Sequence, residues 1–417
     1  MNSVPFKPSK WTLLFLLLSA MMILMGGAAV APALPLISEA FPDAPDSLVS
    51  LIITLPSLAI ALTGFFIGAL SDKIGKIKVL VACIAIFTMA GSSGYYLTSI
   101  YALLIGRFLL GIGIAGITCT TSSLIPCYYE GISRARVLGY QAASMGFGVL
   151  ILEMSGGFLA GISWRAAFLI YLIGIIILAG VIWTMKEPVL LRVDRKPGVS
   201  DEKFPVTPLL FGYITLFLGS MLFFLMPIKF PYFIAHMDAA RILGENTALT
   251  SGLFLGIMGC AASFMGLFYG RVAWRFHRYS ILALTFIFFG IGYCSLGFAS
   301  SLVMVTFAVI CIGLGNGLLM PTILTWIATI TPKQFLGRAS GGFSVSLNIG
   351  QFASTLAIVP VIAIAVTYSN MFLAFGCVAF MFALPYILGI IKEKYGLLHL
   401  VKTWQLLLEK MYVGAGR

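Results

Sequence analysis

The chain has 417 residues, of which 60% are hydrophobic and only 10% are charged, and its formal net charge is +12. So many apolar residues and so few charges exclude an ordinary soluble globular domain. The positive charge does not indicate a nucleic-acid partner, because the lysines and arginines are scattered in short segments between apolar runs instead of gathering on one face. The composition therefore predicts a membrane protein.

Twelve apolar runs along the chain are each long enough for a membrane-spanning helix, which needs about 20 residues. The runs lie at 12–34, 47–71, 79–98, 102–124, 137–160, 165–185, 207–234, 248–269, 279–298, 301–330, 338–363 and 369–391. The longest hydrophilic break, from Lys186 to Val206, separates the first six runs from the last six. We therefore predict an all-α membrane protein with 12 transmembrane helices in two six-helix halves.

The same break divides the chain into an N-terminal half at 1–186, a linker at 187–206, a C-terminal half at 207–391 and a tail at 392–417. Most lysines and arginines fall in segments on the same side of the membrane as the N-terminus, whereas the segments on the other side contain only Arg165 and Arg241. Because cytoplasmic loops are rich in lysine and arginine, we predict that both termini and the linker are cytoplasmic, in a plasma or inner membrane.

The two halves repeat each other at a constant offset in residue number. This offset relates Gly111 to Gly313 and Arg136 to Arg338, but it also places Trp274 at the position of Asp72. Arg107 likewise falls on Val309, so the charges of Asp72 and Arg107 have no counterpart in the second half. Either the first half carries the groups that couple transport to an ion, or the second copy has simply drifted, because a fold repeat does not decide function.

A charged turn lies between the second and third runs and resembles the loop motif GxLaDrxGrkxxxl of the major facilitator superfamily. The matching residues are Gly68, Leu70, Asp72, Lys73, Gly75, Lys76 and Leu80. The resemblance implies the superfamily's fold, in which two parallel six-helix halves bind substrate between them. Asp72 is expected to find a helix N-terminus or a cation. We predict that it docks near Gly337 and Arg338, at the start of the eleventh helix, as a latch when the cytoplasmic side closes.

Two further segments resemble superfamily motifs. Arg107 in LLIGRFLLGIGIAG is similar to the arginine of the fourth-helix motif, which is associated with proton coupling in the family. In the fifth run, GVLILEMSGGFLAG resembles the antiporter motif GxxxGPxxGG, with Leu152 and Glu153 at the positions of its internal glycine and proline. This departure removes a helix-bending proline and adds a carboxylate.

Arg107 and Glu153 are equally far along the chain from the turn at Glu130. Both residues are therefore expected at a similar depth in the membrane, and we predict an ion pair if they share a face. A charge inside a membrane usually has a partner or a task. The pair is either a static structural contact or a proton-coupling pair that opens when Glu153 takes up a proton.

Lys229 lies in the seventh run between Pro227 and Pro231, while the first run has a similar pair of prolines at Pro32 and Pro35. Lys229 either attracts an anionic group of the substrate or extends its ammonium group to the membrane surface. Four polar residues in other runs are further candidates for a substrate cavity. They are Gln141, Asn316, Asn348 and Gln351.

The cysteines are scattered and the three histidines do not cluster, so we expect no metal site and no cofactor. The chain contains neither HExxH nor a Walker A motif, and we predict a transporter that is not an enzyme. The resemblance to the 12-helix drug/proton antiporter-like branch implies a monomer whose partners are a small molecule, protons and the lipid bilayer. We therefore predict proton-coupled export of small amphipathic molecules by alternating access. The alternative is a facilitator or symporter of an organic anion or metabolite.

Overall fold

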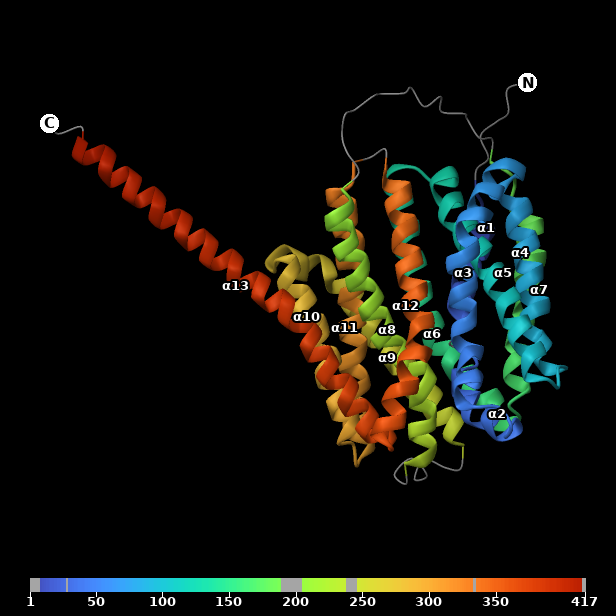
Figure 1. Cartoon of the computed structure of the whole chain (residues 1–417). Coiled ribbons are helices and arrows are strands. Elements are labelled where there is room, and N and C mark those ends of the chain that lie inside the picture. Colours follow the sequence, from blue (N-terminus) through green and yellow to red (C-terminus); the bar gives the residue numbers. More distant parts are fainter. Residues whose placement is uncertain (1–7, 28, 189–204, 238–245, 333–334, 415–417) are drawn as a thin grey trace, which may run out of the picture.

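The computed structural model describes residues 8–27, 29–188, 205–237, 246–332 and 335–414. Within these ranges the chain is helical without a strand, and 12 segments are long and apolar enough to span a membrane. The prediction of an all-α protein with 12 spanning helices is therefore confirmed. The helices stand side by side in one bundle (Figure 1).

The first six spans, which we call the first half, contain seven α-helices and several short 3₁₀ turns. The α-helices are α1 (Lys10–Met22), α2 (Leu34–Ala40), α3 (Asp46–Ile74), α4 (Lys76–Ser92), α5 (Ile100–Tyr128), α6 (Gly131–Ile162) and α7 (Ile173–Thr184). The 3₁₀ turns are η1 (Ile23–Gly26), η2 (Ala31–Ala33), η3 (Ser93–Tyr95) and η4 (Ala166–Leu172).

The last six spans, which we call the second half, are longer and less interrupted. They are α8 (Val206–His236), α9 (Thr247–Arg275), α10 (Arg278–Gly297), α11 (Leu302–Ile330), α12 (Leu336–Ala365) and α13 (Tyr368–Gly414). α13 does not stop at 391, where the last apolar run ends, but continues as one helix that leaves the bundle (Figure 1). The side chains of the tail after Ile391 lie outside the described residues.

The two ends of the bundle differ, and we name them by the chain segments they carry. The linker end contains Ser9, the turn at Gly75 and the flanks of the linker, at Met185 and Pro205; it is at the top in Figure 1. The far end contains the turns at Phe41–Pro45 and at Val366. Chain direction alternates between these ends from one span to the next, as short connections between neighbouring spans require.

The first span is not a continuous helix. α1 ends at Met22, and two 3₁₀ turns precede α2, which begins at Leu34. Gly26 and Gly27 have little intrinsic preference for a helix, and Pro32 has no N–H to donate to the preceding turn. The first span is therefore broken in its middle, and backbone carbonyls near the break are available to side chains.

The two halves contact each other mainly through α6 with α9 and α3 with α12. Small residues allow this approach near the far end of α6. A side-chain carbon added at Gly157 would lie 2.6 Å from the carbonyl oxygen of Ala248 on α9, whereas one at the neighbouring Gly156 would lie 2.1 Å from that of Ala29 in the first span of its own half. Only glycine fits where two backbones pack this closely.

Candidate functional site

A row of polar contacts joins the two halves toward the far end. Ser38 and Tyr232 are 3.0 Å apart, and Thr54 and Thr355 are 2.8 Å apart. Ser57 donates a hydrogen bond of 2.8 Å to the side-chain oxygen of Gln351. We call this row, together with the Asp46–Lys229 pair described below, the far-end seam. Gln351, predicted to line a substrate cavity, therefore connects α12 to α3.

Toward the linker end, α3, α6, α9 and α12 leave open space beside four of their glycines. Added side-chain carbons at Gly64, Gly139, Gly270 and Gly341 would meet nothing within 4 Å. These glycines lie on α3, α6, α9 and α12 respectively. Among the described residues, the hydrogen bonds and the ion pair that join the two halves all belong to the far-end seam or to Tyr232 beside it. This conformation is therefore closed at the far end and open at the linker end.

Arg107 lies on α5 and is buried inside the first half, with an exposed fraction of 1%. Its Nη1 donates a hydrogen bond of 2.8 Å to the hydroxyl of Tyr171, and that hydroxyl donates one of 2.7 Å to the carbonyl of Met25. The guanidinium also lies 4.9 Å from the ring centre of Phe168. The positive charge is thus held by aromatic rings and a phenol, and it is connected to the break in the first span.

Glu153 lies on α6 and is also buried, with 4% of its surface exposed. Its Oε2 has no hydrogen-bond partner, and neither do Nε and Nη2 of Arg107. No ion pair joins the two residues, so the predicted Arg107–Glu153 pair is wrong for this conformation. The reason is that Arg107 is engaged by η4, through Phe168 and Tyr171.

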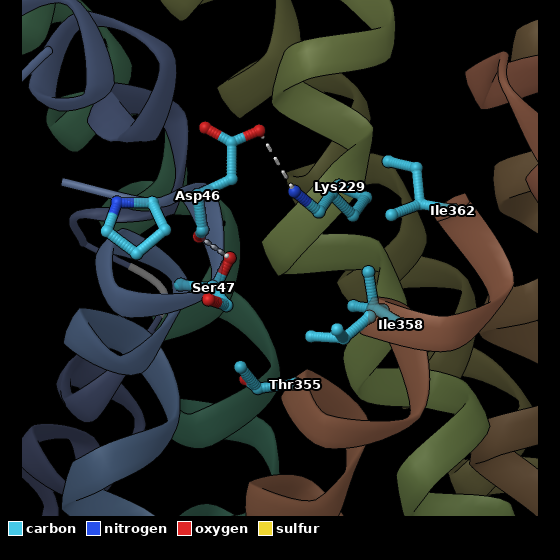
Figure 2. Close-up of a pocket in the computed structure, with 9 residues that line it drawn as sticks. Asp46, Ser47, Lys229, Thr355, Ile358 and Ile362 are labelled. Atoms are coloured by element: carbon cyan, nitrogen blue, oxygen red, sulfur yellow. Dashed lines mark hydrogen bonds and ion pairs between the residues drawn. The ribbon is translucent and has the colours of Figure 1, made fainter. Parts of the chain in front are cut away.

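Lys229 on α8 is paired with an acid of the other half. Its Nζ lies 3.8 Å from Oδ2 of Asp46 at the start of α3, and 4.7 Å from the ring centre of Tyr232. The side chain of Lys229 is 2% exposed, which differs from a lysine that extends its ammonium group to the surface. Figure 2 shows both charged groups beside a pocket between α3, α8 and α12.

That pocket has a volume of about 210 Å³. One wall carries Asp46, Ser47 and Ser50, and the opposite wall carries Lys229 with Thr355, Ile358 and Ile362 (Figure 2). The separation of 3.8 Å is longer than a hydrogen bond, so the ion pair is loose. The pocket therefore combines one buried cation, one partly exposed anion and an apolar wall.

The other residues predicted to bind substrate lie on different helices. The side-chain amide of Asn348 donates a hydrogen bond of 2.8 Å to the carbonyl of Ser344 on its own helix, α12. The side-chain oxygen of Asn316 on α11 is buried without a partner. Gln141 on α6 is half-buried. Of this predicted set, only Asn316 presents a buried polar atom that is unsatisfied within the protein.

The charged turn at the linker end forms a local structure. Asp72 pairs with Lys76 at 3.0 Å, and its side chain is 70% exposed. Gly75 has φ = +113°, a backbone conformation that favours glycine. The carboxylate of Glu187 accepts hydrogen bonds from the backbone N–H groups of Lys76 (2.5 Å) and Ile77 (2.9 Å). Glu187 thus accepts hydrogen bonds from backbone N–H groups at the start of α4, which have no partner within the helix.

The predicted latch is not closed in this conformation. Asp72 is held by Lys76 on its own turn, and Arg338 is exposed at the start of α12, near the ring of Phe335. Lys73 is exposed beside Asp72, whereas Gly68 faces the sulfur of Cys119. Docking of Asp72 at the start of α12 therefore stays a prediction for the opposite conformation.

Comparisons with known proteins agree with this architecture. The model of the Major Facilitator Superfamily matches residues 16–354 and 246–406. The chain is 23% identical to the multi-drug resistance efflux pump PmrA homolog of Lactococcus lactis subsp. lactis (strain IL1403), over 73% of this chain and 75% of that protein. It is 25% identical to the class B tetracycline resistance protein of Escherichia coli, over 78% and 81%.

A solved structure shares the fold. It is a bacterial homolog of the human lysosomal transporter Spinster, in an inward-facing and occupied conformation, with a TM-score of 0.72 and 17% identity. The alignment covers 91% of this chain and 96% of the other. The protein is a multi-pass membrane transporter and not an enzyme, and it belongs to the major facilitator superfamily.

Proposed function

We propose that this transporter exports small amphipathic molecules from the cytoplasm in exchange for protons, as a monomer in a plasma or inner membrane. The printed names of its relatives, a multi-drug resistance efflux pump and a tetracycline resistance protein, support export. The observation that carries proton coupling is Glu153, a carboxyl group buried inside the first half with an unpartnered oxygen. Buried ionisable groups in membrane proteins are usually functional.

The concentration of lysines and arginines at the linker end supports a cytoplasmic position for that end and for both termini. The conformation described above is then the inward-open state of an alternating-access cycle. The far-end seam closes the route to the outside, while space between α3, α6, α9 and α12 admits a molecule from the cytoplasm.

We infer that Glu153 is protonated in this inward-open state. Leaving a buried polar group without a partner costs about 1–3 kcal/mol, and more if it is charged. An ionised Glu153 has no partner here, whereas a neutral one avoids most of that cost. After the proton leaves to the cytoplasm, the carboxylate would be free to pair with the unpartnered nitrogens of Arg107.

Substrate would bind between the halves, where both Gln141 and Asn348 can contribute polar groups. The unpartnered oxygen of Asn316 supports a role for that residue, because a substrate donor would satisfy it. Gln351 contributes indirectly, since its bond to Ser57 must break when the far end opens. A site with few fixed charges suits amphipathic molecules of varied shape.

The pocket around Lys229 favours a second candidate, transport of an organic anion. Lys229 is a buried cation held loosely by Asp46, so an anionic substrate group can compete for it. On this alternative, Lys229→Gln weakens transport of benzoate and spares ethidium. Equal losses of transport for both molecules, or no loss, would show that Lys229 does not belong to the substrate site.

Proteoliposomes containing the purified protein test the proposed function. Ethidium, an amphipathic cation, and benzoate, an organic anion, are loaded in separate samples, and their efflux is followed with and without an acidic external medium. Proton-coupled export predicts that the external acid accelerates ethidium efflux. Efflux that ignores the pH gradient, or transport of benzoate alone, would contradict it.

A further inference from the structure

Tyr171 is fully buried where η4 packs against α4, and its ring lies 5.4 Å, edge to face, from that of Phe87. Its hydroxyl accepts a hydrogen bond from Arg107 and donates one to the carbonyl of Met25. An arginine only donates and a carbonyl only accepts, so the direction of both bonds is fixed. The three groups form what we call the buried chain, and it runs from a charge to the backbone of the first span.

The buried chain ends beside the far-end seam. Met25 lies in η1, the first 3₁₀ turn of the break in the first span, and η2, the second turn, contacts both α8 and α9 of the second half. Pro32 lies close to Gly252 of α9. The carbonyl of Leu34 accepts a hydrogen bond of 3.3 Å from Tyr232, the residue that also contacts Ser38. A shift of the first span at Met25 therefore reaches groups that hold the halves together.

The end of the buried chain at Arg107 carries a positive charge, which a nearby negative charge would attract. Arg107 on α5 contacts Tyr171 directly, and Glu153 on α6 is a buried carboxyl group in the same half. Arg107 binds Tyr171 through Nη1, while its Nε and Nη2 have no hydrogen-bond partner. Oε2 of Glu153 has no partner either. An ionised Glu153 would attract the guanidinium, and the inference requires that this attraction weakens the bond from Nη1 of Arg107 to Tyr171.

We propose that Tyr171 is the positioning residue that transmits the protonation state of Glu153 to the break in the first span. When Glu153 is protonated, Arg107 holds Tyr171 on the Met25 carbonyl and the far end stays closed. When Glu153 is ionised, it draws Arg107 away, Tyr171 releases the first span and the far-end seam weakens. The inference rests on the proposed role of Glu153, and the part of its path from Arg107 to Met25 is a contiguous set of contacts.

The second half provides a matched control. Tyr293 on α10 is fully buried, and its hydroxyl donates a hydrogen bond to the carbonyl of Leu222 on α8, the first span of that half. Its ring stacks on that of Phe372, and none of its described contacts is with an arginine. Tyr293→Phe therefore removes a similar hydroxyl–carbonyl bond, from a tyrosine that is not connected to a charge.

The test measures conformation in full-length protein without requiring a known substrate. Spin labels are placed at Leu138 on α6 and Leu267 on α9, which are exposed near the linker end, after the exposed Cys127 and Cys377 are replaced by serine. The distance distribution is recorded at acidic and alkaline pH for four proteins. They are the labelled parent, Glu153→Gln, Tyr171→Phe and Tyr293→Phe.

The proposal expects the parent to shift from a longer distance at acidic pH toward a shorter one at alkaline pH. Tyr171→Phe and Glu153→Gln should both lose this shift, while Tyr293→Phe keeps it. If Glu153→Gln loses the shift but Tyr171→Phe keeps it, Tyr171 is not the transmitter and the proton site stands. If Tyr293→Phe also loses it, the effect is general loosening and the inference is wrong. If the labelled parent shows no shift in distance, or if Glu153→Gln retains the shift, the proposed proton site at Glu153 is wrong as well.

Discussion

The ammonium group of Lys229 lies 3.8 Å from the carboxylate of Asp46, although the two residues belong to different halves of the protein. The lysine is almost fully buried and the aspartate is 54% exposed. This pair can exist only while the far end is closed, because opening separates α3 from α8. The charge of Lys229 is thus balanced in one conformation and must find another partner in the other.

Removing the charge of Asp46 should favour opening of the far end. Asp46→Asn leaves Lys229 without its anion, but the exposure of Asp46 limits the effect to about 1 kcal/mol, or about a fivefold change in population. Labelling of a cysteine at Ser47, which lines the pocket, should become faster. Asp43→Asn, at another exposed acid of the far end, is the control and should leave the labelling rate unchanged.

Glycines at the two ends of α6 should respond differently to one added methyl group. In Gly157→Ala the new carbon would lie 2.6 Å from the carbonyl oxygen of Ala248, so the closed far end should be destabilised by about 1–3 kcal/mol. Gly139→Ala meets nothing within 4 Å and should be neutral or stabilising by about 0.4–1 kcal/mol. Distance measurements across the far end report the population of the conformation in which that end is closed. Equal effects of both variants would contradict the described seam.

Asp72→Asn tests the latch at the linker end. In the open conformation the change removes only the local pair with Lys76, worth about 0.3–0.5 kcal/mol. In the closed conformation it also removes the predicted interaction with the start of α12, worth about 0.3–1 kcal/mol. The protein should therefore move toward the inward-open state. Distance probes on α3 and α12 at the linker end would show a longer mean distance, and an unchanged distribution would reject the latch.

Sequence patterns were sufficient for the spans, because apolar length alone decides whether a helix can cross a membrane. Pro32, noted in the first run, lies in the 3₁₀ turn η2 at the break of the first span. The partners of the charged residues were harder to obtain. Tyr171 sits in an apolar run with no local signal, and Asp46 lies just before the second span, far along the chain from Lys229. Such pairings depend on how helices pack, which one sequence does not encode locally.

The error on Arg107 and Glu153 has the same origin. Both side chains are buried in the first half, and their equal depth in the membrane stays a prediction. Depth does not determine which face of a helix a side chain occupies. η4 brings Phe168 and Tyr171 to the guanidinium of Arg107, and the aromatic contacts take the place of the predicted ion pair.

Glu153→Gln tests the central claim most directly, because glutamine resembles the protonated carboxyl group but cannot release a proton. The measurement compares two modes of ethidium transport in proteoliposomes, efflux driven by an acidic external medium and exchange at equal pH. Glu39→Gln, at an exposed glutamate of the far end, is the matched control. Glu153→Gln should abolish acceleration by the pH gradient and retain exchange, while Glu39→Gln keeps both. Full gradient-driven efflux in Glu153→Gln would contradict the account and make Glu153 a structural residue.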